Sequence, residues 1–451
     1  MAGIFKNNDI RGTYPIQLDE EIAFKIGYLF GLRLPSSAKV IIVGDSRLST
    51  PVIKKYLTIG LIEANCIVLD AGMGPTPLTY FGAKMDKSIL AGIMITASHN
   101  PKDDNGIKIC NEEGESYHYD NLYHDIELSL DNTPELKHLL DETKLIDAVN
   151  IRKNYFDFLI SKITISNSLT VAVEFGNGAT RDFGDIITEL SCNLLPSRQA
   201  PDGNFPTILP DPTKAVTFAR IKEIAVNKKI DLGIAFDGDG DRVGFLTPKG
   251  HIISPDKITM MLASSLMEKF GSVSVLIDVK ISNATAEYIQ SLGGVVDLTQ
   301  VGHSWVHENL VQSNFDLAAE LSGHYYFNKG YLGFDDGLYT ALVFLELVDT
   351  LISKNIDLDD FVTNLPQYAS TEEFRISMPN SQQDVILERL KLLVAKENGK
   401  LIDIDGVRGE FSKGWFIARK SGTEEALSYR IEGFTQKDLA ELKLKVEELI
   451  Q

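Results

Sequence analysis

Short apolar runs that end in small or polar residues recur along the first part of the chain. Such runs predict strands at residues 39–43, 66–70 and 91–95. Between the first two lies a longer segment, residues 51–64, whose mixed pattern predicts a helix. Alternation of strands and helices is typical of a layered α/β domain.

The same pattern starts again twice. Residues 171–175 and 232–236 predict strands of a second unit, with a turn at residues 176–178 that opens a helix. Residues 274–278 and 315–320 predict strands of a third. The 451-residue chain is too long for one ordinary core, which agrees with several domains.

From about residue 365 the pattern changes to that of an α+β domain. Residues 373–377, 415–418 and 427–431 alternate like strands of a half-exposed sheet. Residues 383–396 and 435–450 have the pattern of amphipathic helices. The predicted domains are residues 1–148, 149–250, 251–364 and 365–451.

Composition limits the class of protein. Apolar residues make up 44% of the chain and charged residues 24%, as in soluble globular proteins. No apolar run reaches the roughly 18 residues that a membrane span needs, so we expect a cytoplasmic protein without membrane contact. The net charge of −19 opposes binding to nucleic acid. Three cysteines are too few for a disulfide framework.

The stretch after the predicted strand 91–95 carries the first candidate chemistry. Ser98 offers a hydroxyl just past a strand, and His99 and Lys108 can bring positive charge to it. Pro101 and Gly106 restrict the shape of the turn. Since the Gly-x-Ser-x-Gly elbow of serine hydrolases is missing, we hypothesise that Ser98 carries a phosphoryl group.

A second motif, Phe236-Asp237-Gly238-Asp239-Gly240-Asp241-Arg242, follows the predicted strand 232–236. Glycines between the three aspartates allow the carboxylates to converge on one cation, and oxygen ligands suit Mg²⁺. A solvated acidic turn is the alternative. A calcium-binding EF-hand is excluded, since Arg242 stands where its glycine belongs and Pro248 where its glutamate belongs. An arginine beside the metal indicates a phosphate between them.

Polar clusters elsewhere supply candidate ligand groups. Glu320, Ser322 and His324 alternate after a predicted strand, so they could share one face and bind sugar hydroxyls. His303 lies in a Gly-His-Ser segment, and either histidine could instead be structural. Arg11 is either a surface arginine or a phosphate ligand. Ligands bind at the carboxyl ends of strands in open α/β sheets, where Ser98, Asp237, Lys280 and Glu320 all lie.

The last motif, Arg419-Lys420-Ser421-Gly422-Thr423-Glu424, lies in the predicted C-terminal domain. A guanidinium fork, two hydroxyls and a glycine-loosened backbone can form a cradle for an anion. Beside a serine loop and a metal loop, this cradle is expected to hold a second phosphate of the substrate, the one that does not react.

In their order along the chain these motifs resemble those of the α-D-phosphohexomutase superfamily, most closely the phosphomannomutase/phosphoglucomutase branch. The ordered segments are residues 9–12, 96–101, 201–206, 237–242, 302–304, 320–324 and 419–424. The resemblance implies three related α/β domains with mixed sheets, plus a C-terminal domain like the TATA-binding-protein fold, around a central active-site cleft.

The resemblance also implies a role for each motif. Ser98 would be the phosphoserine, and with Asp237, Asp239 and Asp241 it would hold one Mg²⁺ per chain. Arg11, Lys108 and Arg242 would line the reacting phosphate, with Lys108, His99 and His324 as candidates for moving protons. Glu320 and Ser322, assisted by Lys280 and His303, would bind the sugar, and Arg419, Ser421, Gly422 and Thr423 would bind the other phosphate.

The activity implied is the interconversion of hexose 1-phosphate and hexose 6-phosphate, with mannose, glucose or both as the sugar. A hexose 1,6-bisphosphate would be both intermediate and activator. Three alternatives stay open: a phosphoglucosamine mutase, a Mg-dependent sugar phosphatase and a non-catalytic protein that binds sugar phosphates or metal. The sequence makes no prediction of oligomeric state.

Overall fold

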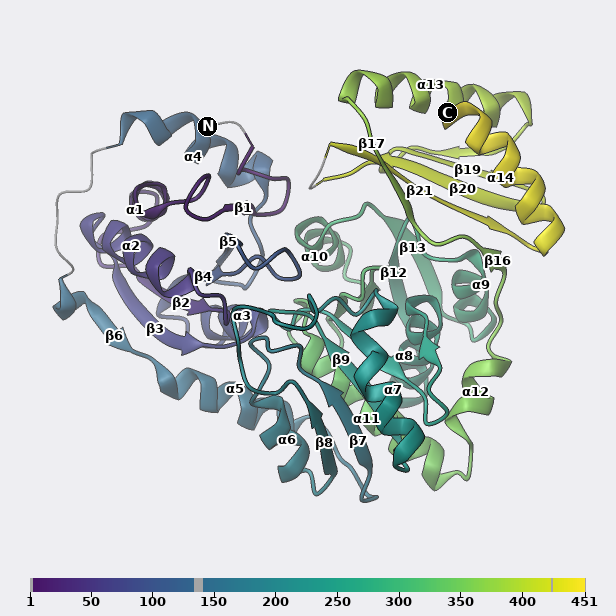
Figure 1. The fold of residues 1–451 in the computed structure, drawn as a ribbon, viewed down its shortest axis with the longest axis horizontal. Coiled ribbons are helices and arrows are strands. Elements are labelled where there is room, and N and C mark those ends of the chain that lie inside the picture. The colour runs from purple at the N-terminus through teal and green to yellow at the C-terminus, as the bar shows by residue number, and fades with distance from the viewer. Residues whose placement is uncertain (1–2, 134–140, 423–424, 451) are drawn as a thin grey trace. The chain divides into compact units, whose positions relative to one another are not determined.

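The computed structural model describes residues 3–133, 141–422 and 425–450, and it divides into two compact units. The first comprises Met1–Ser254 with Ser322–Thr363, and the second comprises Pro255–Leu321 with Asn364–Gln451. Figure 1 labels most elements of both. Among the residues described, no helix is long and apolar enough to span a bilayer.

The first unit begins with a mixed six-stranded sheet of order β1-β5-β4-β2-β3-β6. The inner strands β4, β2 and β3 run parallel, whereas β5 lies antiparallel to both β4 and β1. The predicted strands at 39–43, 66–70 and 91–95 and the helix at 51–64 are confirmed. The bounds are β1 Ile10–Thr13, β2 Lys39–Gly44, β3 Ile67–Met73, β4 Ile89–Ile95, β5 Asp104–Asn111, β6 Leu145–Asp147, α1 Glu20–Gly31, α2 Thr50–Glu63, α3 Thr76–Met85, α4 His124–Ser129 and α5 Val149–Ser161.

A second sheet of the same unit has the order β11-β10-β9-β7-β8. Helix α11 packs on β9 and β10, and the rings of Phe245 and Phe344 stack with centroids 3.9 Å apart. The predicted strands at 171–175 and 232–236 are confirmed. The turn at residues 176–178 does not lead straight into a helix, because further turns intervene before α6 begins at Phe183. The bounds are β7 Thr170–Glu174, β8 Asn193–Ser197, β9 Leu232–Phe236, β10 Val243–Leu246, β11 Ile252–Ile253, α6 Phe183–Glu189, α7 Ala219–Asn227, α11 Gly337–Ser353 and α12 Leu358–Asn364.

In the second unit β12 pairs in parallel with β13 and with β14. The strand predicted at 274–278 is confirmed, and the run at 315–320 contains the shorter strand β14, so that Glu320 follows a strand end. The bounds are β12 Ser274–Asp278, β13 Val295–Thr299, β14 Leu317–Ala319, α8 Pro255–Phe270, α9 Asn283–Ser291 and α10 His303–Gln312. Strand β15, Tyr325–Phe327, belongs to the first unit.

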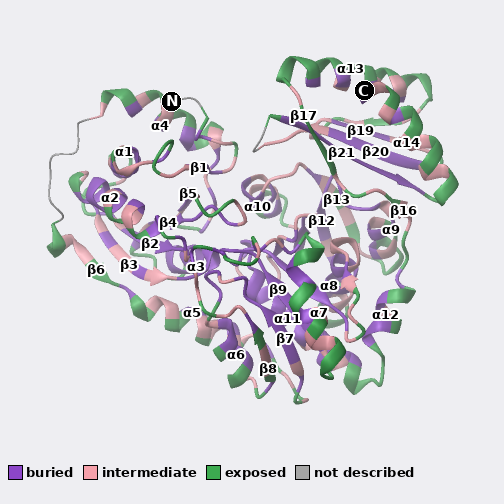
Figure 2. Ribbon diagram, viewed as in Figure 1, coloured by how far each residue is buried: buried purple, intermediate pink, exposed green. Residues whose placement is uncertain are grey.

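The C-terminal sheet has the order β16-β21-β20-β19-β18, with β17 paired to β21. Its strands and helices are confirmed, but the half-exposed character is wrong for β21, every residue of which is buried. Helices α13 and α14 cover one face, and Trp415 and Ile417 pack against Val279 on the other. Figure 2 shows β20 and β21 as buried. The bounds are β16 Ala369–Ser370, β17 Phe374–Ser377, β18 Lys400–Ile402, β19 Val407–Phe411, β20 Gly414–Lys420, β21 Ala426–Gly433, α13 Asn380–Lys396 and α14 Gln436–Ile450.

Candidate functional site

Ser98 lies in a tight turn after β4 and is only 3% exposed. Its φ of +51° places a residue with a side chain in the left-handed region, which costs on the order of 1 kcal/mol. The Ser98 amide donates to Thr96 Oγ1 at 2.8 Å, and Thr96 Oγ1 donates to Asp45 Oδ2 at 2.8 Å. These bonds hold the strained turn in one conformation.

The side chain of Arg47 holds the same turn in place. The sequence patterns did not indicate a function for this residue. The residue is 1% exposed, and its guanidinium donates to four main-chain carbonyls, Ser98 O at 2.7 Å, Asn100 O at 2.8 Å, Pro101 O at 2.5 Å and Asp104 O at 2.9 Å. Asp45 Oδ2 pairs with its Nε at 3.0 Å. Since a buried charge is tolerated only when paired and hydrogen-bonded, this network makes Arg47 part of the turn.

The segment at residues 201–206, which contains two prolines, also contacts Arg47. Gly203 forms an isolated backbone bridge with Arg47, and a Cβ atom on Gly203 would lie 2.5 Å from Ser46 O. The Arg47 guanidinium carbon lies 5.2 Å from the centroid of the Phe205 ring. The segment therefore helps to position the Ser98 turn through Arg47.

Asp237, Asp239 and Asp241 converge directly after β9. All three are at most 1% exposed, and one carboxylate oxygen from each lies within 4.8 Å of the others. A Cβ atom on Gly238 would lie 2.4 Å from Ser98 O, and Gly240 has a φ of +74°. Glycine is thus required at both positions, once for close approach and once for backbone conformation.

The three aspartates fit a hard divalent cation. Asp239 Oδ1 and Asp241 Oδ1 are buried and accept no hydrogen bond from the described residues. Lys108 Nζ donates to the other oxygens of these two carboxylates, at 2.9 Å to Asp239 Oδ2 and 2.5 Å to Asp241 Oδ2. Buried carboxylate oxygens without a donor are the ligands that Mg²⁺ prefers.

Charge in this cluster is divided unevenly. Burial, together with Asp241 and Asp239, raises the pKa of Asp237 well above its usual range. Burial also opposes ionisation of Asp239 and Asp241, but Lys108 outweighs it and lowers the pKa of both. The same two carboxylates raise the pKa of Lys108 against the effect of burial. Lys108 therefore stays a cation, and a divalent metal would supply the remaining positive charge.

The Ser98 hydroxyl lies at the edge of this cluster. Ser98 Oγ donates to Asp237 Oδ2 at 2.6 Å and accepts from Arg242 Nη2 at 2.9 Å. His99 Nδ1 lies 3.1 Å from the same hydroxyl and accepts from Arg242, which leaves the ring proton on Nε2. Burial, followed by the charge of Arg242, lowers the pKa of His99 well below its usual range.

Arg11 adds a further cation to the Ser98 turn. On β1 it lies opposite Gly106, whose missing Cβ leaves room for the main chain of β1. Its guanidinium donates to Asn100 Oδ1 at 2.7 Å and to Asp9 Oδ2 at 2.5 Å. Arg11 is therefore an anchored residue of the Ser98 turn and not a free surface arginine.

The segment Ser322-Gly323-His324 is a turn that packs on the aspartate loop. Val243 N donates to Gly323 O at 3.2 Å, and His324 bridges to the backbone of Arg242. Because the segment is not a strand and Gly323 has a φ of +92°, alternate positions do not define a common face. The expectation that Glu320, Ser322 and His324 share a face on that ground is wrong, and Glu320 belongs to the second unit.

His324 itself faces two carboxylates. Its Nδ1 lies 2.8 Å from Asp335 Oδ2 and 4.0 Å from Asp241 Oδ1. Asp335 was not singled out from the sequence, although two aspartates before a glycine and an apolar helical run are a signal of a helix start.

In the second unit the predicted sugar ligands lie at strand ends. Lys280 follows β12, is 4% exposed, and places Nζ 3.4 Å from Glu373 Oε2. Against the opposing effect of burial, Lys280 holds the pKa of Glu373 at about 2. Glu320 Oε1 accepts from Gly302 N at 2.9 Å, beside His303, the first residue of α10.

The predicted anion cradle begins with Arg419 and Lys420, the last two residues of β20. Arg419 Nε donates to Asp405 Oδ2 at 2.7 Å, an acceptor that Val301 N also uses at 3.0 Å. Ser421 N donates to Ala426 O at 2.8 Å and closes the hairpin. Gly422 lies in the turn of this hairpin, and Thr423 lies outside the described residues.

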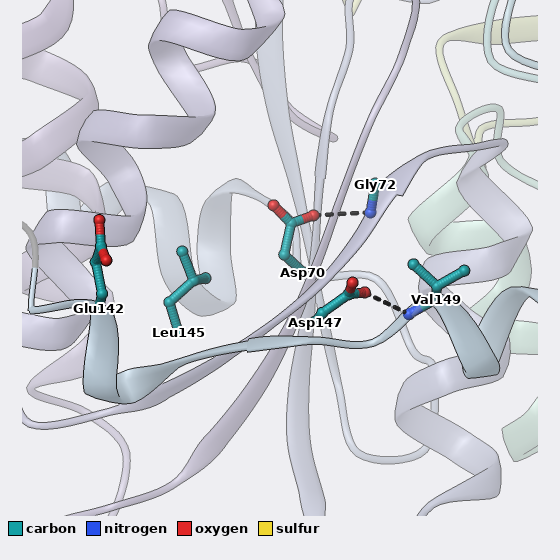
Figure 3. A pocket seen from close by; sticks show the side chains of 6 residues that line it. All are labelled: Asp70, Gly72, Glu142, Leu145, Asp147 and Val149. Carbon is teal, nitrogen blue, oxygen red and sulfur yellow. Dashed lines mark hydrogen bonds between the residues drawn. The ribbon is translucent and has the colours of Figure 1, made fainter.

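A separate cavity of about 530 Å³ opens on the first unit and holds none of the predicted site residues. Figure 3 shows that Asp70 and Asp147 turn to backbone amides, Gly72 N at 2.7 Å and Val149 N at 3.0 Å. Glu142 and Leu145 complete the lining.

A buried serine hydroxyl between a guanidinium and a triad of carboxylates, at the ends of α/β strands, is typical of proteins that transfer phosphoryl groups. Four family models with the description phosphoglucomutase/phosphomannomutase match consecutive parts of the chain. The alpha/beta/alpha domains I, II and III match residues 2–137, 153–250 and 254–368, and the C-terminal domain matches residues 373–449. The chain therefore belongs to the phosphoglucomutase/phosphomannomutase family.

Individual proteins agree with this membership over their full length. A phosphomannomutase/phosphoglucomutase of Pseudomonas aeruginosa is 33% identical over 98% of this chain and 94% of its own. A phosphoglucomutase of Neisseria gonorrhoeae is 30% identical over 99% of this chain and 96% of its own. The crystal structure of a phosphoglucomutase/phosphomannomutase family protein from Burkholderia thailandensis superimposes with a TM-score of 0.86 at 30% identity, over 99% and 96% of the two chains.

Proposed function

We propose that the chain is a phosphohexomutase that interconverts hexose 1-phosphate and hexose 6-phosphate through phosphorylated Ser98. The observation that carries this proposal is the position of Ser98 Oγ, 2.6 Å from Asp237 Oδ2 and 2.9 Å from Arg242 Nη2, in a buried cluster of three carboxylates. A hydroxyl in these surroundings is placed to carry a dianionic phosphoryl group next to both a guanidinium and a metal site.

In the proposed cycle the phosphorus–oxygen bond to Ser98 breaks as a bond forms to a free hydroxyl of the bound hexose monophosphate. The proton of that hydroxyl passes to a base of the protein, and the product is a hexose 1,6-bisphosphate. Its other phosphoryl group then returns to Ser98 Oγ, and the hydroxyl left on the sugar takes the proton back. No phosphate is released in a complete turnover.

Arg242, Lys108 and Arg11 would stabilise the phosphoryl group during transfer. Arg242 already contacts Ser98 Oγ, and Lys108 is held as a cation by Asp239 and Asp241. Asp237, Asp239 and Asp241, with Ser98, would hold one Mg²⁺, which neutralises phosphoryl oxygens when bound.

His324 is the best of the three candidates for proton transfer. Lys108 is committed as a cation to two carboxylates, and His99 Nδ1 already accepts from Arg242. His324 Nδ1 faces two carboxylates, which would stabilise the protonated ring while Nε2 exchanges a proton with a sugar hydroxyl.

Substrate contacts and organisation belong to the same proposal. Glu320, Ser322, Lys280 and His303 would bind the sugar, and Arg419, Ser421, Gly422 and Thr423 would bind the phosphate that does not react. The predicted four-domain division, at residues 148, 250 and 364, and the cytoplasmic location are also proposed. Hexose 1,6-bisphosphate would activate the protein by phosphorylating Ser98.

The proposal is tested by following mannose 1-phosphate, glucose 1-phosphate and glucosamine 1-phosphate in parallel by ³¹P NMR, with Mg²⁺ and a trace of glucose 1,6-bisphosphate. A mutase converts mannose 1-phosphate, glucose 1-phosphate or both to the 6-phosphate without inorganic phosphate. Conversion of glucosamine 1-phosphate alone would indicate the phosphoglucosamine mutase. Steady release of inorganic phosphate would indicate a phosphatase, and no turnover would indicate a binding protein.

A further inference from the structure

We propose that Asp335 is a positioning residue that fixes the ring orientation and the tautomer of His324 for proton transfer. The inference rests on the proposed function of this chain as a phosphohexomutase. It assigns a role to a carboxylate that none of the sequence motifs contains.

The geometry of the pair sets the tautomer. Asp335 is 1% exposed, and its Oδ2 lies 2.8 Å from His324 Nδ1. The contact is an ion-pair approach without the alignment of a hydrogen bond. A carboxylate oxygen this close to a ring nitrogen repels its lone pair, so the contact favours the form in which Nδ1 carries the proton. A carboxylate behind one ring nitrogen is the arrangement by which proteins orient a histidine base and stabilise its protonated form.

Both partners are fixed at the backbone. His324 bridges to Arg242, and Asp335 bridges to Tyr326 in the neighbouring strand β15. The residue after Asp335 is Asp336, which caps α11 by accepting from Tyr339 N at 2.8 Å. The segment that carries Asp335 is thus tied to a buried helix and cannot follow the histidine ring if it rotates.

Asp241 is a second carboxylate that the His324 ring can approach, so the orientation of the ring must be fixed. Asp241 Oδ1 lies 4.0 Å from the same Nδ1 and accepts no hydrogen bond from the described residues. Without the Asp335 carboxylate, rotation of His324 toward Asp241 would bring an imidazole against a proposed metal ligand. Asp335 therefore keeps the histidine away from the aspartate triad.

The chain offers a matched control. Asp359 is 3% exposed and its Oδ1 lies 2.9 Å from His251 Nδ1, in the same unit. Neither residue belongs to the candidate site. Asp359→Asn disturbs an aspartate–histidine pair whose aspartate is equally buried but whose histidine is exposed, and it is expected to leave turnover unchanged.

The experiment is a double-mutant cycle on Asp335→Asn and His324→Gln, measured as kcat and KM for the sugar phosphate that the wild type converts best. We expect Asp335→Asn to lower kcat about 100-fold with KM within about 2-fold, because a general acid–base contributes roughly 100- to 10,000-fold. In the His324→Gln background, Asp335→Asn should lower kcat no further than about 2-fold. Mn²⁺ affinity and the thermal midpoint of Asp335→Asn show whether site and fold persist.

Outcomes separate this inference from the proposed function. A wild type without mutase turnover contradicts the proposed function. If the wild type is active, two results overturn the inference alone. One is that the losses of kcat caused by the two substitutions multiply in the double variant, and the other is that Asp335→Asn is as active as Asp359→Asn. A loss of Mn²⁺ binding or of folding that accounts for the fall in kcat would give Asp335 a structural role and would overturn it too. As a direct readout, ¹⁵N NMR of the imidazole should find the Nδ1–H tautomer in the wild type and a mixture of tautomers in Asp335→Asn.

Discussion

The carbonyl oxygen of Ser98 lies 2.4 Å from the place that a Cβ atom would occupy on Gly238. The Ser98 turn and the aspartate loop are therefore in direct backbone contact, although 139 residues separate Ser98 from Asp237. A change in either backbone moves a hydroxyl relative to the carboxylates around it.

Gly238→Ala should separate the two loops. A real Cβ atom essentially never lies within 3.0 Å of a backbone oxygen, so one backbone must shift. We expect turnover to fall at least about 100-fold, with a loss of stability of about 1–3 kcal/mol. Gly250→Ala is the control, because its Cβ would meet open space and only its φ of +87° is strained. Equal turnover in the two variants, measured as kcat on the preferred sugar phosphate, would contradict the contact.

Arg47→Lys should weaken the Ser98 turn while the charge is kept. A lysine ammonium cannot reach the separate carbonyls of Ser98, Asn100 and Asp104 that the guanidinium joins. Two or more buried carbonyls would lose their donor, at a cost of about 2–4 kcal/mol in the free energy of unfolding. Urea denaturation measures this loss, and kcat should fall with it. A wild-type denaturation curve would exclude the clamp.

Metal removal should stop turnover reversibly. Chelation with EDTA is expected to abolish turnover and added Mg²⁺ to restore it, since two buried oxygens of the aspartate cluster have no donor in the described part of the chain. Asp239→Asn should weaken Mn²⁺ binding, followed by electron paramagnetic resonance, by roughly 10- to 100-fold. Full turnover after exhaustive chelation would show that the cluster serves another purpose.

Asp336 should make stability fall with rising pH. Burial raises its pKa to about 6 from 3.8, against hydrogen bonds from Tyr331 and Tyr155 that lower it. Below about pH 4 the carboxyl is protonated in both the folded and the unfolded chain. Between about pH 4 and 6 the unfolded chain ionises first, which disfavours folding by up to about 2–3 kcal/mol above pH 6.

Comparison of thermal midpoints between pH 4 and 7 tests the sign of this effect. Asp336→Asn removes the titrating group, so the difference in midpoint between wild type and variant should shrink or reverse as the pH rises through this window. If the thermal midpoints of the wild type and Asp336→Asn change in parallel with pH, Asp336 does not titrate in this pH range.

The sequence predicted the local parts of this protein well. Strand ends carry Ser98, Asp237, Lys280 and Glu320 as expected, because a short apolar run followed by polar residues is visible within one window. Glycine spacing in the aspartate loop predicted convergence of its carboxylates correctly, since the required backbone conformation is also local.

Long-range contacts escaped the sequence analysis. Arg47 looked like any arginine in a loop, because its role depends on carbonyls more than 50 residues away. The approach of Asp335 to His324 depends on how the segment between them folds, which the sequence pattern does not show. The face predicted for Glu320, Ser322 and His324 assumed a strand period, but the backbone at Gly323 forms a turn. The burial of β21 likewise depends on residues distant in the sequence, because Val279 packs on the second face of its sheet.

The central claim is that Ser98 carries the phosphoryl group, and mass spectrometry of the intact chain and its peptides tests it most directly. The protein is incubated with glucose 1,6-bisphosphate and Mg²⁺, digested and mapped, with Ser98→Ala alongside. We expect one phosphate on the peptide that contains Ser98, its removal by excess hexose monophosphate, and neither phosphate nor mutase turnover in Ser98→Ala. A Ser98→Ala variant with near-normal turnover, or a phosphate on another residue that turns over with substrate, would contradict the account.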